Sequence, residues 1–414
     1  MDSLMPPRPA VLYISYDGIL EPLGESQVVS YLERLGADFA ITVLTFEKPD
    51  DLADQARITA MRRRLAAADV EWAPRRYHKA PPVLSTAFDV AGGIARGRAI
   101  ARARGVRIVH ARGYVPSLIA LGVRAVGGAA FLFDMRGFWV DEKVEAGHWR
   151  RGGILHRVGK WWERRFFAAA DGVVSLTAAG VRAIPELGVR MRPGATIEVI
   201  PTCADLERFS PAPRDAALAE SLGISGGPVV GCIGTMQNWY MRREMIEALA
   251  VLIRARPRLR VLVVTRDDHA ALREDFARAG VPADRLVLTS ARFEQMPHYM
   301  RLMDAALFFI TPTFSKRGSA ATKLAECLGC GVPVIINDGV GDSGTIVRDA
   351  RAGVVLASLD ADALAALPAR VDALIADPGV AARCRAAAEA SFDLGSGVGR
   401  YRKLYRGLLG GRGD

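Results

Sequence analysis

The chain alternates short apolar runs with longer segments in which apolar residues recur every three or four positions. Short apolar runs are typical of parallel strands buried on both faces, and the periodic segments between them are typical of amphipathic helices. The runs in the first half lie at 11–16, 40–46, 108–111, 130–133, 172–176 and 196–200. Those in the second half lie at 229–233, 260–264, 286–288, 305–309 and 332–336. This alternation predicts an α/β protein with two doubly wound sheets.

The chain is longer than one hydrophobic core usually holds, because it has 414 residues. A proline-containing stretch at 201–213 separates the two sets of strands. We therefore expect an N-terminal domain at 1–200 and a second domain at 201–391.

Cysteine usage and hydropathy favour a protein that is made and kept in the cytoplasm. The five cysteines are scattered and odd in number, which is unlike a disulfide framework. Cys327 and Cys330 have CxxC spacing, but no second pair follows, so we expect them to pack in a core rather than to bind zinc. No apolar core of a signal peptide precedes the first strand, and no apolar run is long enough to span a membrane.

The net charge of +10 raises the question of an acidic partner. Signatures of nucleic-acid-binding modules are absent from the sequence, so no nucleic-acid partner is expected. Much of the excess charge lies at 148–167, HWRRGGILHRVGKWWERRFF, where basic residues alternate with Trp and Phe. This composition suits a helix at the surface of an anionic inner membrane. Equally, the aromatic rings could face the core while the arginines form a solvated face.

The segment 315–336, SKRGSAATKLAECLGCGVPVII, combines a polar turn, a helix, a glycine stop and a buried strand. Backbone N–H groups at a helix start attract phosphate, and Lys323 adds a positive charge there. Glu326 lies four residues after Thr322, on the same helix face, where its carboxylate could accept hydrogen bonds from a ribose diol. The unit is typical of a nucleotide-diphosphate site, although any α/β crossover can carry a Lys and a Glu.

This segment resembles the donor-binding motif of family-4 glycosyltransferases, retaining enzymes of the GT-B fold. In that family a Glu, seven residues and a second Glu grip the nucleotide sugar. Glu326 matches the second Glu, and Gly318 stands in place of the first, which leaves the identity of the sugar open. The sequence KRGSAATKLAE resembles the corresponding segment in a branch of the family found in bacterial surface-polysaccharide gene clusters.

Five further segments match the family in order: 11–35, 108–118, 131–147, 198–211 and 231–241. In the first of them, a strand and a glycine loop precede a helix that we expect to begin at Ser26. The resemblance implies two Rossmann-like domains facing a central cleft, with the C-terminal helix, within 392–414, crossing back to complete the first domain. It implies metal-independent transfer without a bound cofactor.

The resemblance also assigns roles to residues of this sequence. His110, Lys323 and Glu326 are the expected catalytic residues, and His110 is expected to reach the donor sugar. The remaining donor-binding residues are expected to be Gly234, Thr235, Arg242, Arg292, Phe293, Lys316, Ser319 and Thr322. Residues lining the cleft on the acceptor side are expected to be Asp17, Gly18, Gly24, Asp134 and Arg136. Asp134 and Arg136 could instead simply pair with each other.

The resemblance thus implies a retaining glycosyltransferase that uses a nucleotide-diphosphate sugar and a glycan or lipid-linked acceptor. The protein would lie in the cytoplasm, or peripherally on the cytoplasmic face of the membrane. The alternatives are transfer to a soluble small-molecule acceptor and a catalytically inactive nucleotide-sugar-binding subunit. A UDP-sugar epimerase of similar fold is a further rival.

Overall fold

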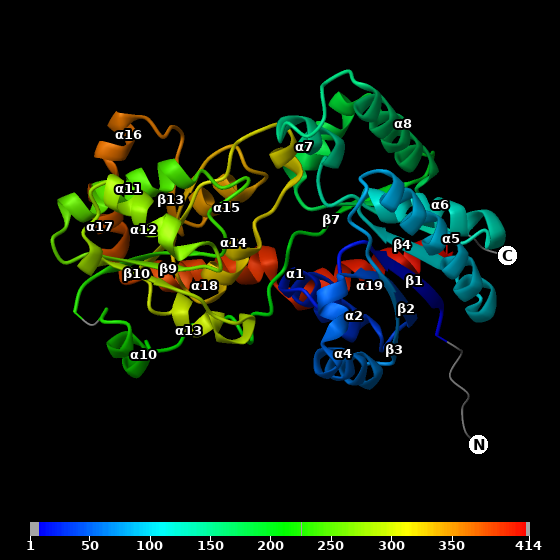
Figure 1. Ribbon diagram of the computed structural model, residues 1–414, viewed down its shortest axis with the longest axis horizontal. Helices are drawn as coiled ribbons and strands as arrows, with labels where there is room; N and C mark the ends of the chain where they lie inside the picture. The colour runs from blue at the N-terminus through cyan, green and yellow to red at the C-terminus, as the bar shows by residue number, and fades with distance from the viewer. Residues whose placement is uncertain (1–7, 225, 411–414) are drawn as a thin grey trace. The chain divides into compact units, whose positions relative to one another are not determined.

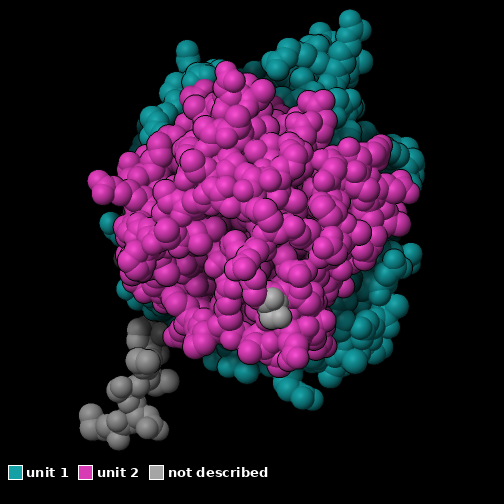
Figure 2. Space-filling model, turned by 90° about the vertical axis from the view of Figure 1, so that its left-hand side faces the viewer, with its two compact units in different colours: residues 1–201, 395–414 teal, residues 202–394 magenta. Residues whose placement is uncertain are grey.

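The computed structural model describes residues 8–224 and 226–410. The chain forms two compact units, coloured separately in Figure 2. Unit 1 comprises Met1–Pro201 and Gly395–Asp414, and unit 2 comprises Thr202–Leu394. The fold class predicted from the sequence is confirmed, because each unit is built on one parallel sheet of the GT-B type.

The sheet of unit 1 has seven parallel strands in the order β3-β2-β1-β4-β5-β6-β7. The strands are β1 (Ala10–Ser15), β2 (Ala40–Glu47), β3 (Val70–Arg76), β4 (Ile108–Arg112), β5 (Ala130–Asp134), β6 (Gly172–Ser175) and β7 (Thr196–Val199). Every residue of β4, β5 and β6 is buried, because helices cover both faces of the central strands.

The helices of unit 1 fall into two layers, visible on either side of its sheet in Figure 1. The chain order runs outward from β1 to β3 and then from β4 to β7, so right-handed crossovers put the two sets of helices on opposite faces. The set after β1 and β2 is α1 (Pro22–Gly24), the π-helical turn η1 (Glu25–Val29), α2 (Ser30–Leu35), α3 (Pro49–Ala53) and α4 (Gln55–Ala67). The set after β3 to β6 is α5 (Leu84–Arg104), α6 (Tyr114–Gly127), α7 (Trp139–Glu145), α8 (Ile154–Ala169), α9 (Ala178–Ala183) and η2 (Ile184–Leu187).

The C-terminal helix α19 (Leu394–Gly410) belongs to unit 1. Its tyrosines Tyr401 and Tyr405 contact Tyr31 of α2 and Phe39 at ring-centroid distances of 5.6 and 5.0 Å, respectively. The helix therefore packs on the face of the sheet that α2 covers.

The sheet of unit 2 has six parallel strands in the order β10-β9-β8-β11-β12-β13. The strands are β8 (Val229–Ile233), β9 (Arg260–Val264), β10 (Leu286–Thr289), β11 (Ala305–Phe308), β12 (Val334–Asn337) and β13 (Gly353–Leu356). The helices are α10 (Ala216–Ser221), α11 (Arg242–Ala255), α12 (His269–Arg278), η3 (Ala283–Arg285), η4 (Phe293–Gln295), α13 (Met296–Met300), η5 (Ser315–Gly318), α14 (Thr322–Gly329), α15 (Ser343–Asp349), α16 (Ala361–Ala365), α17 (Leu367–Ala376) and α18 (Val380–Phe392).

Cys327 and Cys330 lie in the apolar core of unit 2 as free thiols, as the sequence predicted. Among the described residues, no group of three or more His, Cys, Asp or Glu side chains is arranged to hold a metal ion. The described helices also include none with the length and hydropathy of a bilayer-crossing segment.

Two strands escaped the sequence analysis, and both are edge strands. β3 buries only Val70, Trp72 and Ala73 and contains Pro74, and β13 is partly exposed at every second residue. A strand with one neighbour buries less of its surface, so its sequence lacks a continuous apolar run.

The helix start predicted at Ser26 is wrong. The helical segment begins four residues earlier, at Pro22, and Ser26 lies inside the π-helical turn. Proline favours the first helical position, since its fixed φ suits the helix and its missing N–H is not needed there.

Candidate functional site

The carboxyl end of β8 in unit 2 carries a glycine turn that holds Lys323. Gly234 has φ of +74°, a left-handed conformation that favours glycine. The Lys323 ammonium donates a hydrogen bond of 2.6 Å to the Ile233 carbonyl and lies 3.7 Å from the centroid of the Tyr240 ring. A β-carbon on Gly234 would lie 3.6 Å from that ammonium. Strand β8 and helix α14 thus place a cation against a bare backbone turn, which is a suitable place for a phosphate.

A second cation, Lys316, approaches the same loop. Its Nζ atom lies 3.8 Å from the centroid of the Trp239 ring, which precedes Tyr240 in the glycine loop. The loop is fixed to the end of β11, because Thr311 N–H donates to the Trp239 carbonyl over 2.9 Å. Lys316 and Lys323, seven residues apart in sequence, therefore both stack on the two aromatic residues of one loop.

Asn337, at the end of β12, braces this edge of the sheet. Its side-chain oxygen accepts from Ile310 N–H, and its side-chain nitrogen donates to the Ile310 carbonyl, both over 2.8 Å. A buried amide that satisfies both backbone groups of one residue holds the ends of β11 and β12 together. The sequence analysis missed Asn337, Trp239 and Tyr240, because their roles depend on which strand ends meet.

Glu326 lies one turn into α14, on the helix that carries Lys323. Its side chain is half-buried, and this burial raises the pKa of Glu326 to about 7 against the opposing charge of Lys323. No side chain caps the start of α14 at Ala321 among the described residues. The first turn of α14 therefore offers backbone N–H groups without an intrahelical acceptor beside one cation and one carboxylate.

The other predicted donor residues have the following places. Thr235 accepts from Gln237 N–H and donates to Asp267, which also accepts from Met236 N–H. Arg242, at the start of α11, forms an ion pair with Asp275. Arg292 and Phe293 follow the edge strand β10, where the Arg208 guanidinium stacks 5.1 Å from the centre of the Phe293 ring. Ser319 and Thr322 are half-exposed in the loop before α14 and at its first residue.

Asp267 and the neighbouring Asp268 lie in the loop before α12 and at the N-cap of that helix, respectively. Asp268 caps the start of α12 by accepting from two backbone N–H groups, those of Ala270 and Ala271. Asp267 instead supports the glycine loop through Met236 and Thr235.

In unit 1, the loop after β1 makes close contacts that only glycine permits. A β-carbon at Gly24 would lie 2.1 Å from the Gly18 carbonyl oxygen, and one at Gly18 would lie 2.4 Å from a Glu47 carboxylate oxygen. The buried Glu47 carboxylate also accepts from Ile19 and Leu20 N–H. This carboxylate, which the sequence analysis missed, anchors the loop to the end of β2.

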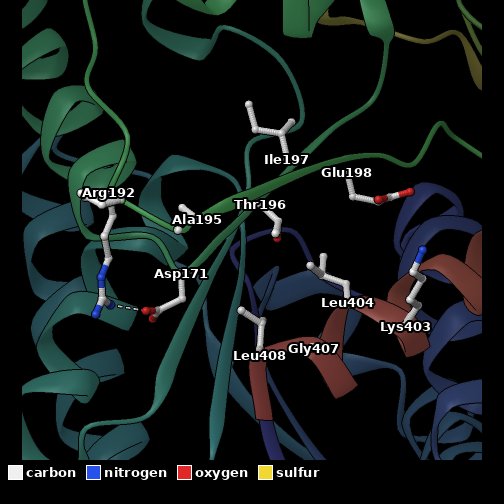
Figure 3. Close-up of a pocket in the computed structure, with 12 residues that line it drawn as sticks. Asp171, Arg192, Ala195, Thr196, Ile197, Glu198, Lys403, Leu404, Gly407 and Leu408 are labelled. Atoms are coloured by element: carbon white, nitrogen blue, oxygen red, sulfur yellow. Dashed lines mark hydrogen bonds and ion pairs between the residues drawn. The ribbon is translucent and has the colours of Figure 1, made fainter. Parts of the chain in front are cut away.

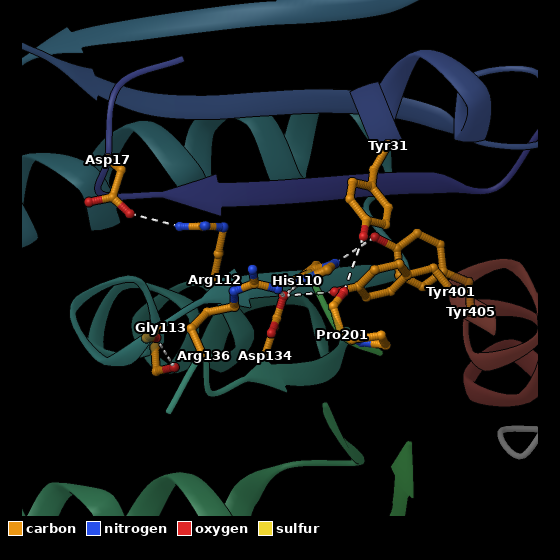
Figure 4. Close-up of polar contacts among 11 residues, drawn as sticks. Asp17, Tyr31, His110, Arg112, Gly113, Asp134, Arg136, Pro201, Tyr401 and Tyr405 are labelled. Atoms are coloured by element: carbon orange, nitrogen blue, oxygen red, sulfur yellow. Dashed lines mark hydrogen bonds and ion pairs between the residues drawn. The ribbon is translucent and has the colours of Figure 1, made fainter. Parts of the chain in front are cut away.

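His110 lies in the interior of unit 1, in a cluster with Asp134, Arg136, Tyr401 and Tyr405 (Figure 4), which we call the His110 cluster. Its Nδ1 atom is 2.6 Å from the Tyr405 hydroxyl, and its Nε2 atom is 3.4 Å from Asp134 Oδ2. The Tyr401 hydroxyl donates to the same Oδ2 over 2.9 Å, and Arg136 lies 3.7 Å from it. The ring of His110 is 1% exposed, so both of its nitrogens face protein partners.

Charge and burial fix the protonation of this cluster. Burial alone would raise the pKa of Asp134, but Arg136, His110 and Arg112 outweigh it and hold that pKa below its usual range. Burial lowers the pKa of His110, although Asp134 opposes the shift. The Asp134 carboxylate is thus ionised and can only accept hydrogen bonds. Neutral His110 therefore donates a hydrogen bond from Nε2 to Asp134, and its Nδ1 accepts one from the Tyr405 hydroxyl.

Arg112, two residues after His110, lies at the carboxyl end of β4. It donates to Asp17 over 2.7 Å, and its guanidinium is 6% exposed whereas the Asp17 carboxylate is 59% exposed (Figure 4). The predicted acceptor-side residue Asp17 is therefore held by a buried cation that the sequence analysis did not name. Since ligands of doubly wound sheets bind at the carboxyl ends of the strands, this pair lies at the edge where a ligand is expected.

A cavity of about 530 Å³ opens elsewhere in unit 1 (Figure 3). It is bounded by the loop before β7, by β7 itself and by the second half of α19, and Lys403, Leu404 and Leu408 contribute to its wall. Asp171 and Thr196 place it at the amino ends of β6 and β7. It therefore lies at the sheet edge opposite to the one where ligands of doubly wound sheets bind.

Comparison with known proteins matches both parts of the chain. Residues 25–208 match the model described as Glycosyltransferase Family 4, and residues 227–374 match the model described as Glycosyl transferases group 1. Over these two segments the chain is similar to glycosyltransferases of family 4 and of group 1. The first matched segment lies in unit 1 except for residues 202–208, which belong to unit 2. The second matched segment lies entirely in unit 2.

Curated relatives of this chain include a D-inositol 3-phosphate glycosyltransferase from Nocardia farcinica, 33% identical over 215 residues. A protein of the same name from Nocardiopsis dassonvillei is 31% identical over 238 residues. The alignments cover 50% and 55% of this chain and 46% and 52% of the relatives, so the chain matches about half the length of each.

Solved structures share the fold of this chain at low sequence identity. Anabaena HepE in complex with UDP and glucose superposes with a TM-score of 0.71 at 17% identity, covering 96% of this chain and 99% of that one. A putative UDP-N-acetylglucosamine 2-epimerase from Listeria monocytogenes superposes with a TM-score of 0.62 at 13% identity, covering 98% of each chain. At these identities the likeness extends to the fold, and transferases and epimerases share it.

Proposed function

We propose that this protein transfers a sugar from a nucleotide-diphosphate sugar to an acceptor hydroxyl, with retention of configuration at the anomeric carbon. The observation that carries the proposal is the position of Lys323, which reaches from α14 to the glycine turn at Gly234. Glu326 follows on the same helix, so one short element offers groups for both the diphosphate and the ribose. The complex of the structural neighbour HepE with UDP and glucose supports a UDP-sugar as the first donor to test.

In the reaction, the bond between the anomeric carbon and the diphosphate oxygen breaks, and a bond from that carbon to the acceptor oxygen forms. The departing diphosphate gains negative charge, which Lys316, Lys323 and the N-terminus of α14 at Thr322 are arranged to stabilise. These groups would take the place of a metal ion. The acceptor attacks on the face that the diphosphate leaves, and its proton passes to a diphosphate oxygen, so no side-chain nucleophile is required.

Glu326 would hold the ribose through its carboxylate. Burial raises the pKa of this group to about 7, because it disfavours the ionised carboxylate. A ligand hydroxyl that donates a hydrogen bond to the carboxylate would favour the ionised form and lower this pKa again. The base would lie near Arg292 and Phe293, and the glycine loop residue Thr235 would border the diphosphate. Arg242 would act only after release from Asp275.

In unit 1, the acceptor side would be formed by the loop that carries Asp17, Gly18 and Gly24. Asp134 and Arg136 would shape it from the end of β5. His110 keeps its predicted role at the donor sugar as part of the proposal, although its present contacts with Asp134 and Tyr405 are those of a residue that positions its neighbours.

Two acceptor classes are favoured by different observations. The basic and aromatic helix α8 favours a glycan or lipid-linked acceptor at the cytoplasmic membrane face, as in polysaccharide biosynthesis. The name of the curated relatives favours a soluble inositol phosphate. A direct comparison of the two acceptors with the same donor would decide between them.

The test is incubation of the protein with UDP-, GDP- and dTDP-sugars, with and without each acceptor, while free nucleotide and glycosylated product are measured. A transferase releases nucleoside diphosphate and forms product only when the acceptor is present. Acceptor-independent release with a changed sugar would indicate an epimerase. Tight nucleotide binding without any turnover of the three donors would indicate a binding subunit, and either result would overturn the proposal.

A further inference from the structure

Helix α8 has two apolar faces, and only one of them packs against the protein. Gly159, Phe166 and Phe167 face the interior of unit 1. On the opposite side, Ile154, Val158 and Trp161 are 72%, 48% and 43% exposed. These three positions are spaced i, i+4 and i+7, so they form one row along the outer side of the helix. The sequence left open whether the aromatic residues of this segment are buried, and the structure divides them between the two faces.

Contacts on the buried side of α8 fix the rotation of the helix about its axis. The buried Glu163 carboxylate accepts from the Tyr114 hydroxyl and from Lys160, both over 2.7 Å. Lys160 also donates to Asp141 over 2.5 Å. Because these contacts tie α8 to α6 and α7, turning the outer row inward would break a buried network, at a high cost in free energy. Exposure of the outer row is therefore a stable feature of the fold.

Positive charge surrounds the outer row. Arg150, Arg151, Arg157, Arg164 and Arg165 are all exposed. The Arg165 guanidinium stacks 4.4 Å from the centre of the Trp161 ring. Glu163 is the only acidic residue of the segment 148–169, and its side chain is fully buried. Within the described part of the chain, none of these five arginines forms an ion pair. Lys160, by contrast, is neutralised by its two carboxylate partners.

We propose that the outer face of α8 docks on an anionic lipid bilayer. An apolar row with a Trp, flanked by arginines and without accessible carboxylates, matches a membrane interface, where rings lie at headgroup depth and cations meet lipid phosphates. A second copy of the chain is a poor occupant, because two such faces would bring ten arginines together. The proposal does not depend on the proposed function, since binding is measured without donor or acceptor.

The test is co-sedimentation of the full chain with vesicles of phosphatidylglycerol and phosphatidylcholine, over a range of salt concentrations. Pure phosphatidylcholine vesicles serve as the uncharged reference. We expect binding to the anionic vesicles that weakens as salt rises. Failure to bind anionic vesicles even at low salt would overturn the proposal.

Two double variants separate the apolar and the charged contributions. Arg157→Gln with Arg164→Gln should weaken binding by about 20-fold or more and flatten its salt dependence, since each cation near the surface contributes about fivefold. Val158→Gln with Trp161→Gln should weaken binding at every salt concentration and leave the salt dependence unchanged. All four side chains are on the outer part of the helix, so the thermal midpoint should not change.

The matched control is Arg62→Gln with Arg63→Gln on α4, which removes the same charge from exposed positions on the opposite face of the sheet. If this control weakens binding as much as the α8 pair, attraction is a property of net charge and the proposal is wrong. If Val158→Gln with Trp161→Gln instead dissociates a dimer in sedimentation velocity and leaves vesicle binding unchanged, the face binds protein, and the proposal is also wrong.

Discussion

Replacement of Glu326 by Gln should make the ligand-free protein more stable at alkaline pH while weakening its hold on nucleotide. Burial raises the pKa of Glu326 to about 7 from an ordinary value of 4.5. The ionised carboxylate is therefore disfavoured in the folded state, because no ligand hydroxyl replaces the water that it loses. Gln has nearly the same shape and carries no charge.

The sign and the size follow from proton linkage. Below pH 4.5 the carboxyl is protonated in both folded and unfolded chains, and it carries no penalty. As pH rises to 7, the unfolded chain loses the proton first, so folding stability falls. Above pH 7 the penalty approaches about 3–4 kcal/mol, because the pKa rises from 4.5 to about 7 and each unit of difference corresponds to about 1.4 kcal/mol. The Gln variant escapes this loss.

The assay is thermal unfolding of parent and variant at pH 5 and pH 8.5, without nucleotide. For a unit of this size, the Gln variant should melt about 7–14 °C above the parent at pH 8.5, and the gap should be much smaller at pH 5. Glu220→Gln, which removes an exposed carboxylate from α10 of the same unit, is the control and should show no such dependence on pH. An equal gap at both pH values, or a less stable Gln variant at pH 8.5, would refute the argument.

Ligand binding provides the second half of this prediction. Glu326→Ala should weaken nucleotide binding by about 1.5–3 kcal/mol, or tenfold or more, since a charge-assisted hydrogen bond is lost. Isothermal calorimetry that gives the same affinity for variant and parent would exclude the ribose role. A variant that is more stable but binds more weakly would identify Glu326 as a group retained for binding at the expense of stability.

Three other substitutions test the remaining parts of the site. Lys323→Ala should weaken nucleoside diphosphate binding at least about tenfold and leave binding of the parent nucleoside unchanged, and calorimetry that shows equal losses for both ligands would contradict a phosphate contact. His110→Ala should lower turnover without changing nucleotide affinity. Tyr405→Phe removes only the hydroxyl that contacts His110 Nδ1. If this variant lowers turnover equally, His110 positions its neighbours and does not contact the sugar. Gly24→Ala should destabilise the protein by about 1–3 kcal/mol in urea unfolding, because its β-carbon would overlap the Gly18 carbonyl. An unchanged urea midpoint would mean that the loop shifts to accommodate the methyl group.

The strands of both sheet centres were predictable from the sequence, since a strand covered by helices on both faces must be apolar throughout its length. The edge strands β7 and β10 were also predicted, whereas the edge strands β3 and β13, whose burial is interrupted, were not. Lys323 and Glu326 could also be selected in advance, because their spacing on one helix is a local property. Their functional roles remain predictions.

The partners of these residues were decided only by the tertiary structure. The contact of Lys323 with the Ile233 carbonyl spans 90 residues of sequence, and that of His110 with Tyr405 spans 295. Sequence pattern could indicate a His on a buried strand, but it could not show that Tyr405 of the C-terminal helix contacts its ring. The same holds for α8, whose composition fits both a buried and an exposed aromatic face. Burial depends on which surfaces the other elements cover, and this is a property of the whole fold.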